Sequence, residues 1–175
     1  MFWNINGFTE LLKSTDATAW LDKNCDICFL SETHLTKGEN FNIDGFQCIN
    51  HPFSDVLATK PRGGVTCMVK HDFMQHIIDI DCDNDDTIIL SFHGGHTVFG
   101  TYIPPVDSPY YDDTCFTTIP NTFSGNDGSK VVIGGGDLNS RVGNVSHSVP
   151  VVSSKYRDNV DKCTWKTLTE NLFYV

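Results

Sequence analysis

The sequence predicts a layered α/β domain built mainly from short β-strands. Short apolar runs recur along the chain between turn residues, which is typical of buried strands. Residues 9–21 instead carry an imperfect apolar face at helical spacing. Strands, hairpins and helices mixed in this way favour a layered fold over a regular βαβ dinucleotide-binding sheet.

The expected elements follow in chain order. The predicted strands are a short segment that ends at residues 4–7 and the stretches 26–31, 45–49, 65–70, 76–80, 87–92, 97–102 and 131–133. The first predicted helix, 9–21, starts at Thr9 because threonine followed by an acidic residue favours a helix N-terminus. A last helix is predicted at 164–172. Residues 121–129 are polar and contain glycines, which predicts a loop, and Pro120 would interrupt any helix before it.

Length and charge limit the possible functions. A chain of 175 residues, 39% hydrophobic and 19% charged, fits one globular domain spanning 1–175. The net charge of -10 counts against electrostatic binding of nucleic acid, because such binding normally uses Lys and Arg contacts to the phosphates. It does not exclude a nuclease, because a bound cation reverses the local field. We therefore expect weak, salt-sensitive and metal-dependent substrate binding.

The N-terminal sequence and the cysteines indicate the expected cellular compartment. There is no signal-peptide pattern and no apolar run long enough to span a bilayer, so we expect an intracellular, cytoplasmic or nuclear protein rather than a secreted one. The seven cysteines are then expected to be free thiols. Cys25 and Cys28 form a lone C-x-x-C, which makes a zinc site improbable, and Cys28 is better explained as core packing.

Oxygen-bearing side chains stand where four predicted strands end. Gly136-Asp137-Leu138-Asn139 follows the strand at 131–133. Three earlier tetrads repeat this arrangement, namely Asn4-Ile5-Asn6-Gly7, Ser31-Glu32-Thr33-His34 and Tyr102-Ile103-Pro104-Pro105. Because a β-sheet can gather such ends at one edge, these donors can form a site for a hard divalent cation.

These motifs, in this order, resemble the endonuclease/exonuclease/phosphatase superfamily. The closer resemblance is to the apurinic-type endonuclease domain of non-LTR retrotransposons. It is carried by W-N-I-N-G at 3–7, D-I-x-x-L-x-E-T at 26–33, R-G-G-V at 62–65, Y-I-P-P at 102–105 and G-D-x-N-x-R at 136–141. Ser-Pro-Tyr-Tyr at 108–111 also fits that subgroup. The resemblance implies a DNase I-like fold, a two-sheet β-sandwich flanked by helices.

The resemblance also implies a reaction and a set of roles. It implies a Mg²⁺-dependent phosphodiesterase, with Mn²⁺ as an alternative, that nicks one strand of DNA by metal-activated water attack. Glu32 is then the principal metal ligand, with Asn4 close to it. Asp137 orients and deprotonates the water, Asn139 holds that water or a phosphate oxygen, and Tyr102 donates its hydroxyl to the phosphate. Arg141 is a candidate phosphate contact.

Each of these residues also has an ordinary structural explanation. Glu32 could be a solvated side chain at a strand end, Asp137 a turn former and Tyr102 a core aromatic with a wet hydroxyl. Asn4 could be a turn residue and Arg141 a solvated arginine. Gly134-Gly135-Gly136 lacks the features of a nucleotide-binding loop and is expected to form a tight turn that lets Asp137 approach the phosphate.

The acidic stretch from Asp79 to Asp86 suggests a calcium loop at first sight. With Asp79 as the first loop position, Asn84 falls where glycine is required and Leu90 where glutamate is required. The EF-hand match therefore fails, and a solvated hairpin loop is expected instead.

The resemblance ends before the family's C-terminal Ser-Asp-His motif, which the chain up to Val175 does not contain. We therefore expect a C-terminally truncated, partial domain with impaired catalysis, exposed strand edges and a tendency to self-associate. The alternatives are an inactive remnant and another superfamily member such as a phosphoinositide phosphatase. No sequence feature indicates a protein or membrane partner.

Overall fold

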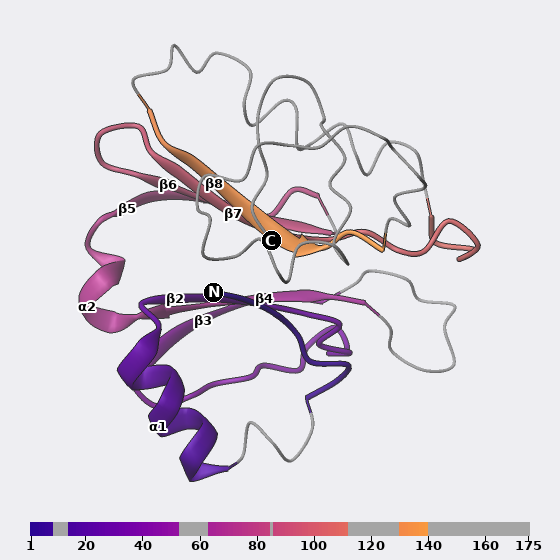
Figure 1. Cartoon of the computed structure of the whole chain (residues 1–175), viewed down its shortest axis with the longest axis horizontal. Helices are drawn as coiled ribbons and strands as arrows, with labels where there is room; N and C mark the ends of the chain where they lie inside the picture. The colour runs from indigo at the N-terminus through magenta and orange to yellow at the C-terminus, as the bar shows by residue number, and fades with distance from the viewer. Residues whose placement is uncertain (9–13, 53–62, 85, 112–129, 140–175) are drawn as a thin grey trace, which may run out of the picture.

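The protein folds as two four-stranded β-sheets that pack face to face (Figure 1). The computed structural model describes residues 1–8, 14–52, 63–84, 86–111 and 130–139. The first sheet has the order β1-β2-β4-β3, with β1 at Phe2–Asn4, β2 at Ile27–Ser31, β4 at Val65–Lys70 and β3 at Phe46–His51. The second has the order β5-β6-β7-β8, with β5 at Ile77–Asp81, β6 at Thr87–Phe92, β7 at Thr97–Tyr102 and β8 at Val132–Asp137. This arrangement agrees with the predicted layered, DNase I-like sandwich.

The core lies in layers set by the alternation of side chains along each strand. In β2, Phe29 faces the other sheet and packs in a cluster with Ile88 and Leu90 of β6. Its neighbour Leu30 faces outward and packs with Leu21 of the first helix. Since both faces of β2 are covered, its sequence is an almost uninterrupted apolar run rather than an alternating one. Cys28 is fully buried on the same outer side, which confirms the core-packing interpretation of this thiol.

Helix α1 spans Thr15–Asn24 and lies on the outer face of the first sheet (Figure 1). It begins after Ser14, whose side chain accepts a hydrogen bond from the Ala17 amide, as expected for a helix N-cap. The predicted helix at 9–21 therefore has the wrong end, because the observed helix continues to Asn24. Its predicted start lies in residues 9–13, outside the described residues.

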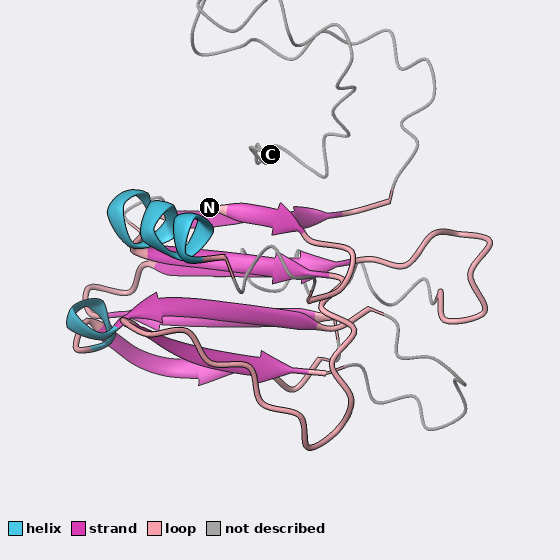
Figure 2. Ribbon diagram, turned by 90° about the horizontal axis from the view of Figure 1, so that it is seen from below, coloured by secondary structure: helices cyan, strands magenta, loops and turns pink. Residues whose placement is uncertain are grey.

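A second, single-turn helix was not predicted. Helix α2 covers His71–Met74 and connects β4 to β5 across the sandwich. Figure 2 shows α1 and α2 near one end of the strands and the longer connecting loops at the opposite end. In the part of the chain that the structure describes, no helix is long and apolar enough to cross a bilayer.

The predicted turn at Gly134–Gly136 is wrong, because these glycines lie inside β8. A Cβ on Gly134 would stand 2.0 Å from the ring of Phe99, and one on Gly135 would stand 2.6 Å from the ring of Phe2. Gly136 has a φ of +148°, and a Cβ there would stand 1.8 Å from the Thr101 carbonyl oxygen. The glycines are therefore needed for close packing within the sheets, and they continue the strand up to Asp137.

The acidic hairpin differs in part from its predicted solvated loop. Asp79 and Asp81 are exposed on β5, as a solvated segment would be. Asp86 is instead buried, with 7% of its surface exposed, directly before β6. Its backbone carbonyl accepts hydrogen bonds from the Tyr102 amide (2.8 Å) and the Thr101 hydroxyl (3.0 Å), which holds it against the second sheet.

Candidate functional site

The side-chain amide of Asn4 joins residues from three different strand ends. Its Nδ2 atom donates hydrogen bonds to Glu32 Oε1 (3.0 Å) and to Asp137 Oδ2 (2.6 Å). Asn4 and Glu32 come from the first sheet, whereas Asp137 ends β8 of the second. Two carboxylates 105 positions apart in the sequence (137 minus 32) therefore share one amide group.

Strand direction explains why these residues meet. β1 runs parallel to β2 with Asn4 paired with Ser31, so the two strands end side by side and Glu32 follows at once. β7 runs parallel to β8 with Tyr102 paired with Asp137, which brings these two residues to the same end of the second sheet. Because parallel neighbours end at one edge, four polar side chains from distant segments gather where the sheets come together.

The loops that follow these strands have an unusual backbone. Among the described residues, the non-glycine positions with positive φ are Asn6 (47°), Glu32 (52°), His34 (55°) and Asn139 (42°). All four lie directly after the ends of β1, β2 or β8. Left-handed backbone is costly for residues with a Cβ, and such residues concentrate at functional sites.

Short local hydrogen bonds hold the polar side chains in place. Asn4 Oδ1 accepts from the Asn6 amide (2.9 Å), and Asp137 Oδ1 accepts from the Asn139 amide (3.0 Å). The Asn139 side chain donates from Nδ2 to the Ile103 carbonyl oxygen (3.0 Å). Asn4 and Asp137 are therefore each held by the backbone two residues further along the chain, and Asn139 is anchored across to the loop after β7.

Tyr102 lies next to the two carboxylates. It is 9% exposed and belongs to the core between the sheets, as the core-aromatic explanation expects. Burial raises the pKa of the Tyr102 hydroxyl above its usual value, and the negative charges of Glu32 and Asp137 and a hydrogen bond to Glu32 raise it further. The hydroxyl therefore keeps its proton and serves as a hydrogen-bond donor.

Two residues near the site were not predicted for it. His34 Nε2 lies 3.8 Å from Glu32 Oε2, so its ring stands beside the carboxylate. Asp86 also faces Tyr102, since its charge contributes to the raised pKa of that hydroxyl. The position of His34, two residues after Glu32 in the same tetrad, was a usable signal. No sequence signal pointed to Asp86, because its position near Tyr102 depends on how β6 pairs with β7.

The predicted phosphate contact Arg141 lies outside the described residues. Within the described ranges, no cluster of three or more His, Cys, Asp or Glu side chains is arranged to hold a metal ion. The oxygen donors that do converge are the two carboxylates of Glu32 and Asp137, with the Asn4 amide between them.

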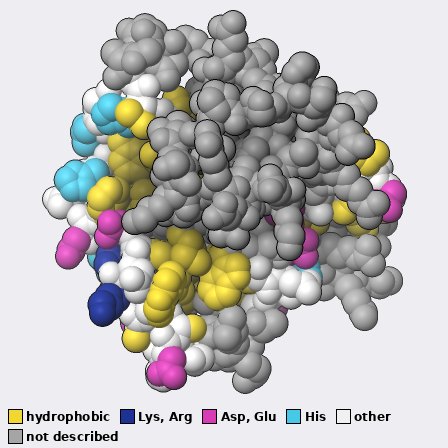
Figure 3. All heavy atoms as spheres, viewed as in Figure 1, with side chains coloured by type: hydrophobic (Ala, Val, Ile, Leu, Met, Phe, Trp, Pro, Cys, Tyr) yellow, Lys and Arg dark blue, Asp and Glu magenta, His cyan; other side chains and the backbone are white. Residues whose placement is uncertain are grey.

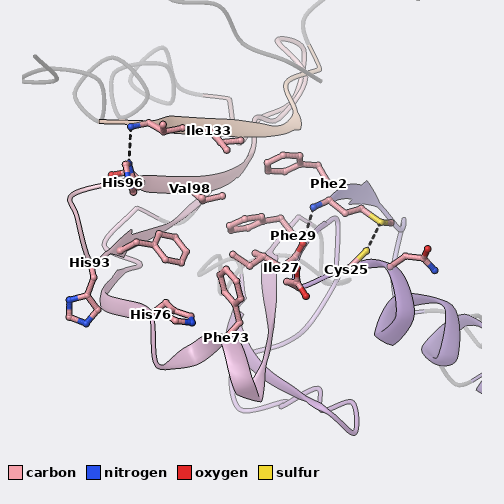
Figure 4. Close-up of a pocket in the computed structure, with 16 residues that line it drawn as sticks. Phe2, Cys25, Ile27, Phe29, Phe73, His76, His93, His96, Val98 and Ile133 are labelled. Carbon is pink, nitrogen blue, oxygen red and sulfur yellow. Dashed lines mark hydrogen bonds between the residues drawn. The ribbon is translucent and has the colours of Figure 1, made fainter. Parts of the chain in front are cut away.

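A sizeable cavity lies at the opposite end of the sandwich (Figure 4). It has a volume of about 630 Å³ and is lined mainly by apolar side chains at the beginnings of β1, β2, β7 and β8. Phe29 and Phe73 line it, with His76, His93 and His96 along one side (Figure 4). This cavity shares no residue with the group formed by Asn4, Glu32 and Asp137. We therefore do not assign the reaction site to it.

The face of the molecule in Figure 3 shows little positive charge. Hydrophobic side chains of the described residues form several areas on this face, and Lys and Arg side chains occupy one small area. This pattern agrees with the acidic composition of the whole chain, whose net charge is -10.

The comparisons with known proteins identify the family of this chain. The model of the Endonuclease/Exonuclease/phosphatase family matches residues 1–150. That match includes every strand end described above. A search of curated proteins finds no match.

Proposed function

Since the chain belongs to the endonuclease/exonuclease/phosphatase family, we propose that it is a Mg²⁺-dependent phosphodiesterase that nicks one strand of DNA. The family supports a hydrolase of the nuclease or phosphatase type. The retrotransposon-like motifs quoted above favour DNA as the substrate. The observation that carries the proposal is the shared amide of Asn4, which holds Glu32 and Asp137 within hydrogen-bonding distance of one group.

The donor set fits a hard divalent cation. Mg²⁺ is typically bound by one or two carboxylates together with water, and Glu32 and Asp137 supply two. Both acids are held close together at an exposed strand end, where a cation would offset their mutual repulsion. We propose that Glu32 is the main ligand. When bound, the metal would neutralise phosphate charge and make a coordinated water more acidic.

The orientation of Asn4 bears on its own role. Its Nδ2 faces both carboxylates, whereas its Oδ1 accepts from the Asn6 amide. In this orientation Asn4 holds the two acids in position, and its oxygen is turned towards its own loop. For Asn4 to act as a metal ligand as well, the side-chain amide would have to turn over.

The protein side chains divide the hydrolysis between them. Asp137 accepts a proton from the attacking water as the water oxygen forms a bond to phosphorus. The bond from phosphorus to the leaving sugar oxygen then breaks, and that oxygen takes a proton from solvent. Tyr102, kept protonated by its raised pKa, donates a hydrogen bond to a phosphate oxygen. Asn139 holds the attacking water or a second phosphate oxygen.

A plasmid-nicking assay tests this proposal. Supercoiled DNA is incubated with the purified chain and Mg²⁺, with and without a chelator, and the open-circle product is quantified. We expect nicking that stops in the chelator. We expect Asp137→Ala to lower the rate by roughly 10²- to 10⁴-fold, the usual contribution of a positioned acid or base. Glu32→Ala removes the proposed main metal ligand, so we expect it to lower the Mg²⁺-dependent rate as well.

The matched control is Asp79→Ala, which removes an exposed carboxylate from β5, at the far edge of the second sheet from β8. It should nick at the wild-type rate. Equal nicking by all four proteins would indicate a contaminant and contradict the proposal. The absence of nicking in the wild type would support an inactive remnant instead.

A further inference from the structure

A second cavity opens directly beside the proposed reaction site. It has a volume of about 310 Å³ and is lined chiefly by Tyr102, Pro104, Pro105, Asp107, Pro109 and Tyr110. Tyr102 lines this cavity and also lies next to Glu32 and Asp137, so the cavity and the carboxylate group are neighbours. The cavity is therefore placed to contact whatever flanks a phosphate held at Tyr102.

The turn that forms the cavity wall is held by its own hydrogen bonds. The Ser108 amide donates to the Pro105 carbonyl oxygen (2.8 Å), and the Tyr111 amide donates to the Ser108 carbonyl oxygen (3.1 Å). The Tyr110 amide donates to Ser108 Oγ (3.3 Å). Prolines with fixed φ at 104, 105 and 109 restrict the backbone further. The wall is thus ordered before any ligand enters.

The lining chemistry selects a flat, uncharged ring over another phosphate. Proline and tyrosine rings make most of the wall that the described residues form. Among these described lining residues the charged group is the carboxylate of Asp107, and none is Lys or Arg. An anion would be repelled there, whereas a heterocycle can stack on an aromatic ring and donate a hydrogen bond to a carboxylate. The volume is near the lower end of the usual range for ligand sites, so it suits one ring system rather than several.

We propose that this cavity holds the nucleobase of a nucleotide next to the scissile phosphate, with Tyr110 as the stacking surface. The choice of a nucleotide as ligand rests on the proposed function. The net charge of the chain strengthens the argument. With a charge of -10, counterion release supplies little affinity for DNA, so contacts to the bases must supply more of it.

The test compares the binding of two probes to the intact 175-residue chain. One probe is a short fluorescent single-stranded oligonucleotide, and the other is the same sugar–phosphate chain without bases. Anisotropy is measured in Ca²⁺, a hard cation that takes the same oxygen ligands as Mg²⁺. We expect the wild type to bind the base-bearing probe more tightly. Tyr110→Ala should weaken that binding by about 5- to 150-fold, the usual effect of losing one stacked base.

A double comparison assigns the effect to Tyr110. On the probe without bases, Tyr110→Ala should bind as the wild type does, because the stacking partner is already absent. Tyr110→Phe keeps the ring and should retain the preference for bases. Val106→Ala is the matched control, since Val106 lies on the same loop, is 72% exposed and does not line the cavity. If Tyr110→Ala lowers the melting temperature, Tyr110→Leu removes the ring while keeping an apolar side chain.

The outcomes separate this proposal from the proposed function. Equal wild-type affinity for both probes, or an unchanged preference for bases in Tyr110→Ala, would overturn the nucleobase site even if plasmid nicking is normal. A preference for bases that disappears in Tyr110→Ala would support the site even if the wild type does not nick. In that case the hydrolase proposal fails alone.

Discussion

Asn4 links the two sheets at the point where catalysis is proposed. Its single amide nitrogen donates to one carboxylate from each sheet, at 3.0 Å and 2.6 Å. Without that donor, Glu32 and Asp137 would face each other as like charges. The residue therefore contributes to the stability of the sandwich and to the geometry of the acids at the same time.

Tyr102 gives a prediction for alkaline pH. Its pKa is raised in the folded protein by burial and by the charges of Glu32 and Asp137. Above about pH 10 tyrosine in the unfolded chain loses its proton while folded Tyr102 keeps it, so the folded state binds more protons and stability falls as pH rises. We expect the free energy of unfolding to drop more steeply above pH 10 in the wild type than in Tyr102→Phe, by up to about 1.4 kcal/mol per pH unit.

Urea denaturation at a series of pH values from neutral to alkaline measures that difference. The buried thiols Cys28 and Cys67, whose pKa values are also raised by burial, add the same dependence to both proteins and cancel in the comparison. Identical pH slopes for the wild type and Tyr102→Phe would mean that Tyr102 ionises in the folded state as it does in the unfolded chain.

At the scale of single elements, β8 depends on glycine at successive positions. Gly134→Ala would force a Cβ against the ring of Phe99, with 2.0 Å between the two carbon atoms. Overpacking of this kind usually costs about 1–3 kcal/mol. We expect that loss in chemical denaturation, and we expect Phe99→Leu to recover part of it when combined with Gly134→Ala, because a smaller side chain leaves room for the methyl group.

Gly136→Ala is the contrasting variant in the same strand. Its Cβ would meet the Thr101 carbonyl oxygen at 1.8 Å, and its φ of +148° disfavours any L side chain. Phe99→Leu should therefore give Gly136→Ala no recovery. Equal recovery in both double variants would mean that the clash with the Phe99 ring is not what makes glycine necessary at Gly134.

The strands were largely predictable from sequence because apolar runs identify them directly. The strands at 65–70, 87–92 and 97–102 have the predicted bounds. The predicted strand at 131–133 is too short, since β8 continues to Asp137. Glycine has low strand propensity, and a run of glycines is typical of a turn. What decides the conformation of β8 is the packing of Phe99 and Phe2 against it, which no local pattern reveals.

The site was predictable only in part for the same reason. Glu32 and Asp137 stand out because each follows an apolar strand, and Asn4 ends the first one. That Asn4 donates to both acids depends on how β1 and β8 lie next to each other, which is a tertiary property. The acidic run around Asp86 predicts a solvated loop, yet the Asp86 backbone carbonyl accepts a hydrogen bond from the Tyr102 amide.

At the scale of the whole molecule, apolar side chains are exposed at the β8 edge of the second sheet. β8 is an edge strand among the described residues, and Val131 and Ile133 are 53% and 50% exposed beside the large cavity. An exposed apolar edge is a template for pairing with another chain. The high negative charge opposes such association, and it does so less as salt increases.

This balance predicts that the 175-residue chain self-associates through β8 and that salt strengthens the association. Sedimentation velocity over a range of concentrations should detect dimers or larger species. Ile133→Lys adds a charge at the edge and removes apolar contact area, so we expect association at least about tenfold weaker, as follows from losing one buried isoleucine side chain at an interface. Ile78→Lys is the matched control, because Ile78 is 56% exposed on β5 at the other edge of the same sheet. A wild type that stays monomeric at every concentration and salt, or an equal effect of both lysines, would show that the β8 edge does not drive association.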